Sequence, residues 1–198
     1  MPRAGVTKEK IFDVAEKIAA REGYARVNLG SIAREFGIQK PSLYKHVSSL
    51  AEIQDALAAR GLQGLYNALR EATDEAPAEG VNKTKGGRAE GAKALRAAAF
   101  AYRRCARENP GLYAAFQATH VKRGRETQEI AQKVLTNVVE LLKRFGIPDE
   151  SVIHAARSLR SLLHGFVSLE MEDGFGLPED VEESFAIAVE RWLLGWKK

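Results

Sequence analysis

Apolar residues recur along the chain with helical spacing, and no segment shows the strict polar–apolar alternation of a half-buried strand. The first fifty residues predict three short helices, over residues 8–22, 29–36 and 40–46. Thr7 is suited to cap the first helix, and Gly23 is suited to end it. Gly37 is expected to end the second helix, and Pro41 stands in the first turn of the third, where its missing N–H costs nothing. These residues predict a compact three-helix unit.

The longer helices are expected after residue 48. The pattern predicts them over residues 49–75, 92–108, 112–116, 125–145, 149–172 and 178–196. Residues 76–91 are rich in glycine, alanine and charge, so we expect them to form a mobile loop. The predicted fold class is therefore all-α, with one domain over residues 1–48 and a second helical domain over residues 49–198.

Charge is distributed unevenly along the chain. The 198 residues are 45% hydrophobic, which is enough to bury a core, and the net charge is +4. Residues 1–50 carry nine basic and five acidic side chains, whereas residues 170–190 carry eight acidic side chains and no lysine or arginine. The positive excess in the first quarter permits a nucleic-acid partner, and the acidic end is expected to face a different partner or solvent.

Several classes of protein are disfavoured. Cys105 is the single cysteine, so an internal disulfide is excluded, and it is expected to be buried packing or, alternatively, an oxidant sensor. The first residues lack the apolar run of a signal peptide, and no stretch approaches the ~20 apolar residues of a membrane span. We expect a soluble cytoplasmic protein without a membrane partner. No His, Asp or Glu spacing predicts a metal site, and no cofactor is expected.

The segment 31–46 has the spacing of two helices that cross at a steep angle. Ala33 is small enough for the close contact, and Gly37 can adopt the turn conformation four residues later. The third helix then exposes a polar face that suits a DNA major groove. The predicted DNA-binding residues are Asn28, Gln39, Lys40, Pro41, Ser42, Tyr44, Lys45, His46 and Ser48. The alternative is a three-helix unit that packs in this way without a DNA partner.

The chemistry of these side chains suggests their roles. Lys40 can reach guanine acceptors or a phosphate, Gln39 can pair with adenine, and Ser42 can read either kind of group. The next three polar residues, 44–46, are better suited to backbone phosphates. Ser48, at the start of the following helix, and Asn28, before the second helix, are expected to hold further phosphates.

Residues 8–50 resemble the DNA-binding domain of the TetR family of bacterial repressors. The pattern Ile32-Ala33-x-x-x-Gly37-Ile38 carries this resemblance, and Leu43-Tyr44-x-His46 is its most specific part. The rest of the chain is similar to the all-helical regulatory half of the family. Residues 160–166 and the Trp192-x-x-x-Trp196 ending resemble the subfamily named for a Trp-His-Gly motif, although Leu163 replaces its tryptophan. The family's common Lys-x-x-Leu element is absent at 48–51, and Gly30 is a poor helix former.

The resemblance implies that the fourth to seventh helices enclose a small-molecule effector. Candidate ligand-binding residues are Leu62, Tyr66, Leu69, Phe100, Tyr102, Phe116, His120 and His164. From the residues alone, most of these also fit an ordinary core. Arg103, Arg104 and Arg107 belong to a second basic cluster, which is either a solvated face or a portal for an anionic ligand.

The last two helices are predicted to form the interface of a homodimer, because exposed apolar stripes would promote aggregation. The candidate interface residues are Leu159, Leu163, Phe166, Phe185, Val189, Trp192 and Trp196. A dimer would place two recognition helices about one DNA turn apart, ~34 Å, which predicts a palindromic operator.

The sequence therefore predicts a ligand-responsive repressor that binds double-stranded operator DNA and is released by an effector through a population shift. An enzyme is disfavoured, since no Ser-His-Asp set, phosphate-binding glycine loop or carboxylate pair is found. A second alternative is a helical module that recruits a protein partner through its acidic C-terminal face. The effector, the operator and the choice between repression and activation stay open.

Overall fold

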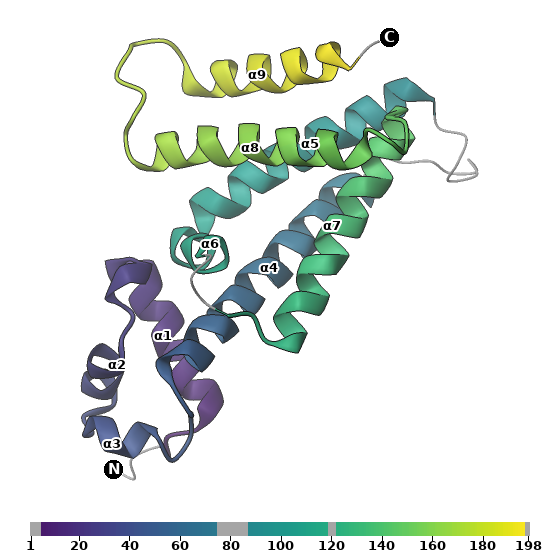
Figure 1. Cartoon of the computed structure of the whole chain (residues 1–198). Coiled ribbons are helices and arrows are strands. Elements are labelled where there is room, and N and C mark those ends of the chain that lie inside the picture. The colour runs from purple at the N-terminus through teal and green to yellow at the C-terminus, as the bar shows by residue number, and fades with distance from the viewer. Residues whose placement is uncertain (1–4, 75–86, 119–121, 197–198) are drawn as a thin grey trace. The chain divides into compact units, whose positions relative to one another are not determined.

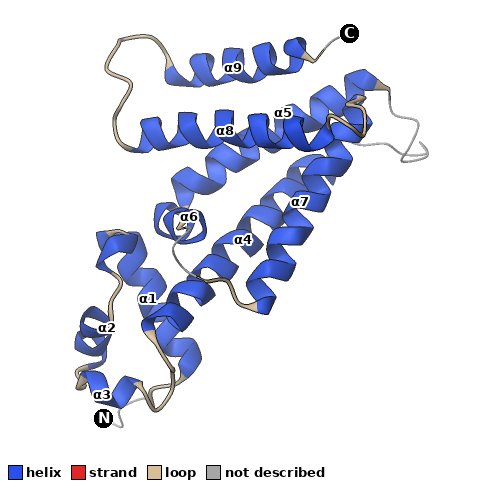
Figure 2. Ribbon diagram, viewed as in Figure 1, coloured by secondary structure: helices blue, strands red, loops and turns tan. Residues whose placement is uncertain are grey.

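The computed structural model describes residues 5–74, 87–118 and 122–196. Within these ranges the chain forms nine α-helices and one short 3-10 helix, with no strand (Figures 1 and 2). The elements are α1 (Lys8–Glu22), η1 (Tyr24–Arg26), α2 (Leu29–Phe36), α3 (Lys40–Leu43), α4 (Leu50–Asp74), α5 (Arg88–Glu108), α6 (Pro110–Gln117), α7 (Arg125–Phe145), α8 (Val152–Met171) and α9 (Val181–Gly195). The predicted all-α fold class is confirmed.

The chain packs as two compact units. The first contains residues 1–64 and 108–131, and the second contains residues 65–107 and 132–198. Helices α4 and α7 each contribute to both units. Because this division follows packing, it does not test the predicted functional boundary at residue 48, which stays a prediction.

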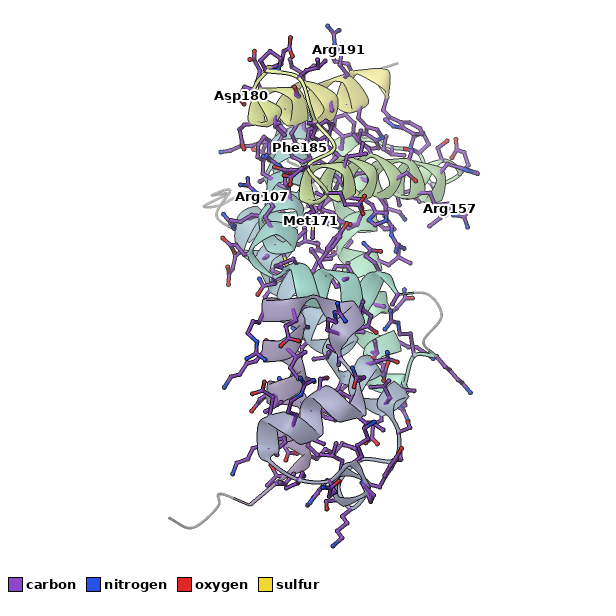
Figure 3. All side chains as sticks on the ribbon, turned by 90° about the vertical axis from the view of Figure 1, so that its left-hand side faces the viewer. Arg107, Arg157, Met171, Asp180, Phe185 and Arg191 are labelled. Atoms are coloured by element: carbon purple, nitrogen blue, oxygen red, sulfur yellow. The ribbon has the colours of Figure 1, made fainter. Side chains whose placement is uncertain are left out.

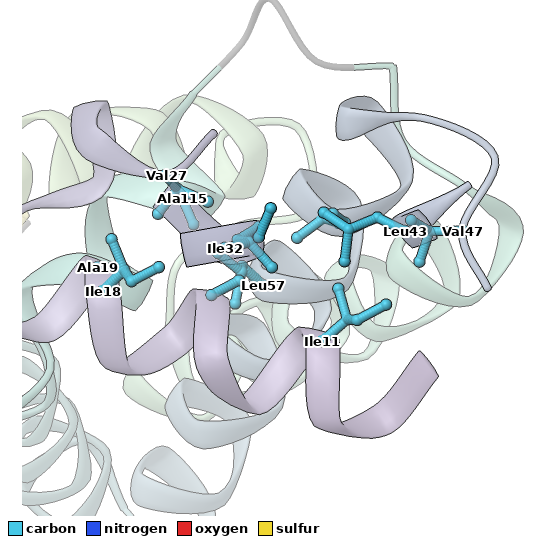
Figure 4. Packing of buried hydrophobic residues seen from close by; sticks show 12 residues of the cluster. Ile11, Ile18, Ala19, Val27, Ile32, Leu43, Val47, Leu57 and Ala115 are labelled. Atoms are coloured by element: carbon cyan, nitrogen blue, oxygen red, sulfur yellow. The ribbon is translucent and has the colours of Figure 1, made fainter. Parts of the chain in front are cut away.

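The first unit has its core between α1, α2, α3 and the start of α4. Ile11, Ile32, Leu43 and Leu57 are completely buried there (Figure 4). Helix α6 joins the same unit through a glycine, since a Cβ at Gly111 would lie 2.5 Å from the backbone of Ala19 in α1. The helix-turn-helix segment and α6 therefore share one packed body.

The second unit includes a helical hairpin made by α8 and α9. Phe185 of α9 is completely buried between the two helices (Figure 3). Its ring packs edge-on against Phe166 of α8 and Phe100 of α5, with centroids 5.1 Å away in each case. Such edge-to-face aromatic packing stabilises the hairpin and holds it on α5.

Helix α5 begins at Arg88, so the expected mobile loop is wrong for residues 88–91; its first part, residues 76–86, lies outside the described residues. Tertiary packing explains the difference. A Cβ at Gly91 would lie 2.5 Å from the backbone of Phe145, so glycine permits α5 to contact α7 closely. The guanidinium of Arg88 also stacks 4.3 Å from the centre of the Phe145 ring.

Other helix ends differ by a few residues. The regular part of α3 ends at Leu43, and residues 44–46 continue as a turn in which the His46 N–H donates to Leu43 O at 2.9 Å. Helix α9 begins after Asp180, whose carboxylate accepts the N–H of Glu183 at 2.8 Å. A capping carboxylate of this kind fixes the start of a helix better than apolar spacing does.

Candidate nucleic-acid interface

The turn between α2 and α3 has the geometry that the sequence predicts. Gly37 has φ +64° and ψ 35°, a left-handed conformation that favours glycine. Its N–H donates to Arg34 O at 3.0 Å, and the N–H of Ile38 donates to Ala33 O at 3.1 Å. Ala33 is buried at the crossing. The chain therefore turns sharply and places α3 across the end of α2.

The surface of α3 and the following turn faces solvent. Leu43 and Val47 are buried and anchor the segment, whereas the Tyr44 side chain is 56% exposed. Ser42 is half-buried, and the other predicted contacts in this segment are exposed: Gln39, Lys40, Pro41, Lys45 and His46. Among the described residues, neither lysine forms an ion pair. Two cations and a phenol are thus exposed within six consecutive residues.

Gly30 has a role beside this face. A Cβ at Gly30 would lie 2.9 Å from Lys40 Cε and 3.0 Å from Asn28 Oδ1. The absence of a side chain allows the Lys40 stem to lie across the start of α2, so this poor helix former is explained by space.

Asn28 is occupied with capping α2. Its Oδ1 accepts the N–H groups of Gly30 at 2.9 Å and Ser31 at 3.0 Å, and its Nδ2 donates to Arg26 O at 3.0 Å. The Ser31 hydroxyl in turn accepts the Asn28 N–H at 3.1 Å, which completes a capping box. The side chain of Asn28 therefore fixes the start of α2 in this structure.

A carboxylate binds the donors at the start of α4. Glu52 accepts the Ser48 N–H at 2.6 Å, the Ser48 hydroxyl at 2.7 Å and the Lys8 ammonium at 2.5 Å. The Lys8 hydrogen bond and then those of Ser48 lower the pKa of Glu52 from 4.5 to about 2. Ser48, predicted to hold a phosphate, thus already has an anionic partner. The role of Glu52 was not predicted from the sequence, although a glutamate three residues after Ser49 is a capping-box signal.

Ion pairs tie α1 to its neighbours. Arg60 of α4 donates to Asp13 at 2.7 Å and to Glu16 at 2.5 Å, both on α1. Arg21 of α1 pairs with Glu35 of α2 at 2.6 Å. These exposed or half-buried pairs each contribute little stability, but together they fix the angles between the helices that carry the candidate interface.

The structure divides the candidate ligand-binding residues between its two compact units. Leu62 and Phe116 belong to the first unit, and His120 lies outside the described residues. The second unit contains Tyr66, Leu69, Phe100, Tyr102 and His164. Leu69 and Tyr102 are buried, and burial lowers the pKa of the half-buried His164, with the charge of Arg160 acting in the same direction. The effector site stays a prediction.

The residues predicted to form the dimer interface lie in two kinds of environment. Leu159, Leu163, Phe185 and Val189 are buried inside the protomer, so they hold the α8–α9 hairpin together. Phe166, Trp192 and Trp196 are half-buried, and the indole of Trp192 donates to the Ser158 hydroxyl at 2.9 Å. A different set of apolar side chains is exposed on these two helices, and none of them was predicted from the sequence: Ile153, Leu169, Met171, Ile187 and Leu194.

Arg103 is neither a solvated cation nor part of a portal. Its side chain is 5% exposed and donates to Glu170 of α8 at 2.6 and 2.7 Å, and also to Glu182 of α9. Arg104 is exposed, and Arg107 lies 3.7 Å from Glu170. Within the described ranges, no group of three His, Cys, Asp or Glu side chains is placed to hold a metal ion.

Comparison with known proteins agrees with this geometry. Residues 11–57 match the model of the bacterial regulatory proteins of the tetR family, and residues 95–192 match the tetracyclin repressor-like C-terminal domain. An uncharacterised HTH-type transcriptional regulator of Bacillus subtilis (strain 168), YobS, is 36% identical over 98% of this chain and 94% of its own length.

Solved structures share the fold at low sequence identity. The TetR-family transcriptional regulator PfmR from Thermus thermophilus has a TM-score of 0.66 and 21% identity, over 98% of this chain and all of that one (100%). A TetR variant from Acinetobacter baumannii AYE, in complex with minocycline, has a TM-score of 0.63 and 16% identity, over 97% of each chain. In the described residues, no helix is long and apolar enough to cross a bilayer. The family models and the relative together show that this chain belongs to the TetR family of bacterial transcriptional regulators.

Proposed function

We propose that this protein is a homodimeric repressor that binds a palindromic operator through α3 and is released by a small-molecule effector. The exposed surface of residues 39–46 is the observation that supports this proposal most directly. This surface is polar and cationic, and the buried side chains of Leu43 and Val47 hold it on the core of the first unit. A short element of this kind can enter a major groove, with Gln39 and Lys40 at its leading end.

The dimer in this proposal forms through α8 and α9. Exposed apolar residues on both helices support it, since Ile187 and Leu194 are 52% and 41% exposed on one face of α9. Charge supports an antiparallel pairing of two copies. Arg157 lies near the start of α8, and Asp173 is the second residue after its end, so a two-fold axis would bring opposite charges together.

The proposed effector is a small, mainly apolar molecule. The half-buried side chains of Tyr66, Phe100 and His164 provide apolar surface with two polar tips. A TetR variant of the same fold was solved in complex with minocycline, which supports a small-molecule effector for this protein. The effector would shift the population of dimers toward a spacing of the two α3 surfaces that no longer fits successive grooves.

Operator binding is tested with a duplex selected from a random pool by the wild-type protein. We expect Lys40→Ala and Tyr44→Ala each to lower the affinity for this duplex by about tenfold, or about 1.4 kcal/mol, which lies within the range typical of a lost contact. The matched control is Lys133→Ala, which removes an exposed cation from α7.

The salt dependence of affinity separates specific contacts from general attraction. The logarithm of the wild-type affinity should fall linearly with the logarithm of the salt concentration. A slope that is shallower by about one unit in Lys45→Ala would assign Lys45 to a phosphate. Equal affinity of Lys40→Ala, Tyr44→Ala and wild type would contradict the α3 assignment, provided that all three retain the same melting temperature.

A further inference from the structure

Arg123 binds the end of α6 from the segment that precedes α7. The two N–H groups of its Nη2 are shared among the carbonyls of Ala115 at 3.2 Å, Phe116 at 2.9 Å and Ala118 at 3.0 Å. The last carbonyls of a helix lack intrahelical partners and carry the negative end of the helix dipole. A guanidinium that binds three of them is therefore a C-terminal cap.

The residues after Arg123 are bound to α4. The N–H of Gly124 donates to Asp55 Oδ2 at 3.0 Å, and a Cβ at Gly124 would lie 2.6 Å from that oxygen. The buried Thr127 hydroxyl lies 3.4 Å from the Asp55 carbonyl. The segment 123–127 thus connects the end of α6 with Asp55, in the second turn of α4.

The other end of α6 lies against α1 and α4 with no space for side chains. A Cβ at Gly111 would meet the Ala19 backbone at 2.5 Å, and a Cβ at Gly61 would meet the Leu112 carbonyl at 2.7 Å. Ala19 and Gly61 belong to helices that form the core of the helix-turn-helix unit. Because these close contacts leave no space between the helices, a rigid-body displacement of α6 would be transmitted to α1 and α4.

Polar atoms at this junction are left without partners. Arg123 Nη1, Asp55 Oδ1 and the Tyr24 hydroxyl of η1 are each buried and form no hydrogen bond with any described residue. Burial raises the pKa of Tyr24, and the nearby Arg123 charge partly opposes that rise. Buried donors and acceptors without partners are costly, so these three atoms mark a strained point at the junction.

We propose that Arg123 is a positioning residue of the regulator: by capping α6 from the start of α7, it holds α6 against α1 and so sets the orientation of the helix-turn-helix. The inference rests on the proposed DNA-binding function. Arg123 does not contact DNA in this proposal, and the junction acts through packing. Operator binding and the state of residues 111–118 and 123–128 are then coupled, each stabilising the other.

The coupling is measured by hydrogen exchange of the full-length dimer, with and without the selected duplex. In the wild type we expect the duplex to slow exchange at residues 29–46 and also, by at least about fivefold, at residues 111–118 and 124–128. In Arg123→Ala the slowing at residues 29–46 persists, while the slowing at the junction disappears. Protection confined to residues 29–52 in the wild type would overturn the proposal, whatever the variants do.

Affinity and its salt dependence give a second readout. Arg123→Ala is expected to weaken operator binding about five- to tenfold with an unchanged salt slope, because a less fixed helix-turn-helix is populated less in its binding conformation. Arg123→Lys, which keeps a donor for the carbonyls, should recover part of the loss. The control Arg125→Ala removes a neighbouring cation whose side chain is 93% exposed.

Each remaining result has one meaning. A salt slope lowered by about one unit in Arg123→Ala would make Arg123 a phosphate contact and refute the positioning role. Identical affinities for Arg123→Ala and Arg125→Ala would refute it as well. If the wild-type protein selects no duplex, the proposed function itself is contradicted. This failure is distinct from those above, because it occurs at the selection step, before any variant is measured.

Discussion

Glu52 reduces the free positive charge beside the candidate DNA surface. Its carboxylate takes the Lys8 ammonium and both donors of Ser48, all of which would otherwise be available to a phosphate. The same contacts fix the start of α4 and join it to α1. Glu52 therefore stabilises the folded protein, but it neutralises positive charge that would otherwise attract DNA.

Glu52→Gln is expected to have opposite effects on stability and DNA affinity. The pKa of Glu52 is lowered to about 2, so its contribution to stability is complete above pH 4.5 and is lost as the pH falls toward 2. At pH 7 the variant should lose about 1 kcal/mol, after allowance for solvent screening of the partly exposed pair. Urea unfolding at pH 7 and pH 2 measures this loss, which should become small at the lower pH.

The DNA arm of the same experiment uses the selected duplex at pH 7. Removing the carboxylate frees Lys8, so we expect tighter binding and a salt slope steeper by up to one unit. Glu9→Gln is the matched control, because it removes an exposed carboxylate beside Lys8 that caps no helix. Weaker binding by Glu52→Gln, at unchanged folding, would show that Glu52 orders the surface more than it neutralises it.

At the residue scale, the sequence predicts exposure better than it predicts hydrogen-bond partners. The polar face of residues 39–46 follows from spacing, because Leu43 occupies the core position and its neighbours cannot. The partners of Asn28 and Ser48 do not follow from spacing. Capping groups compete for the same donors and acceptors as a ligand, and only the three-dimensional arrangement decides between them. Arg123 carries no local sequence signal, because its partners come from α6.

At the scale of elements, an ion network around the buried Arg103 joins three helices of the second unit. Arg103 of α5 forms two hydrogen bonds with Glu170 of α8, pairs with Glu182 of α9 and lies 5.0 Å from the centre of the Phe185 ring. The Arg103 hydrogen bonds lower the pKa of Glu170. The network therefore positions the hairpin that we propose as the dimer interface.

Arg103→Met is expected to destabilise the protein by about 3 kcal/mol, because it leaves the largely buried carboxylate of Glu170 without its main partner. The double variant Arg103→Met with Glu170→Gln should recover part of this loss. Denaturant unfolding measures both, and Arg104→Met serves as a control at an exposed neighbour. A loss that the second substitution does not reduce would mean that packing, and not the unpaired charge, is responsible.

Helix ends were predictable where a cap is local. Thr7, Gly23 and Gly37 mark the ends of α1 and α2 as expected, since each cap acts within a few residues of its own chain. The start of α5 was not predictable. Gly91 favours a loop in the sequence, and only its contact with Phe145 shows that glycine is needed there for close helix packing.

At the scale of the whole molecule, the proposed function requires two copies of α3 at a fixed spacing. A monomer has one such surface and loses the gain in affinity that comes from binding two half-sites together. The hydrophobic stripes of α8 and α9 led to the prediction of an interface, yet their most apolar members are buried in the protomer. Each helix has one face for its partner helix and another that is exposed, and spacing alone does not separate the two.

The double variant Ile187→Glu with Leu194→Glu tests the exposed face of α9. Both side chains project from the same side of the helix, so two carboxylates there would be buried against each other in a two-fold dimer at a high cost. We expect a folded monomer in sedimentation, with affinity for the palindromic duplex lowered by about 10²-fold or more and affinity for a single half-site unchanged. Leu135→Glu, at a comparably exposed position on α7, should remain dimeric. A double variant that stays dimeric and keeps its preference for the palindrome would place the interface elsewhere, because like charges at its centre cannot be accommodated without loss.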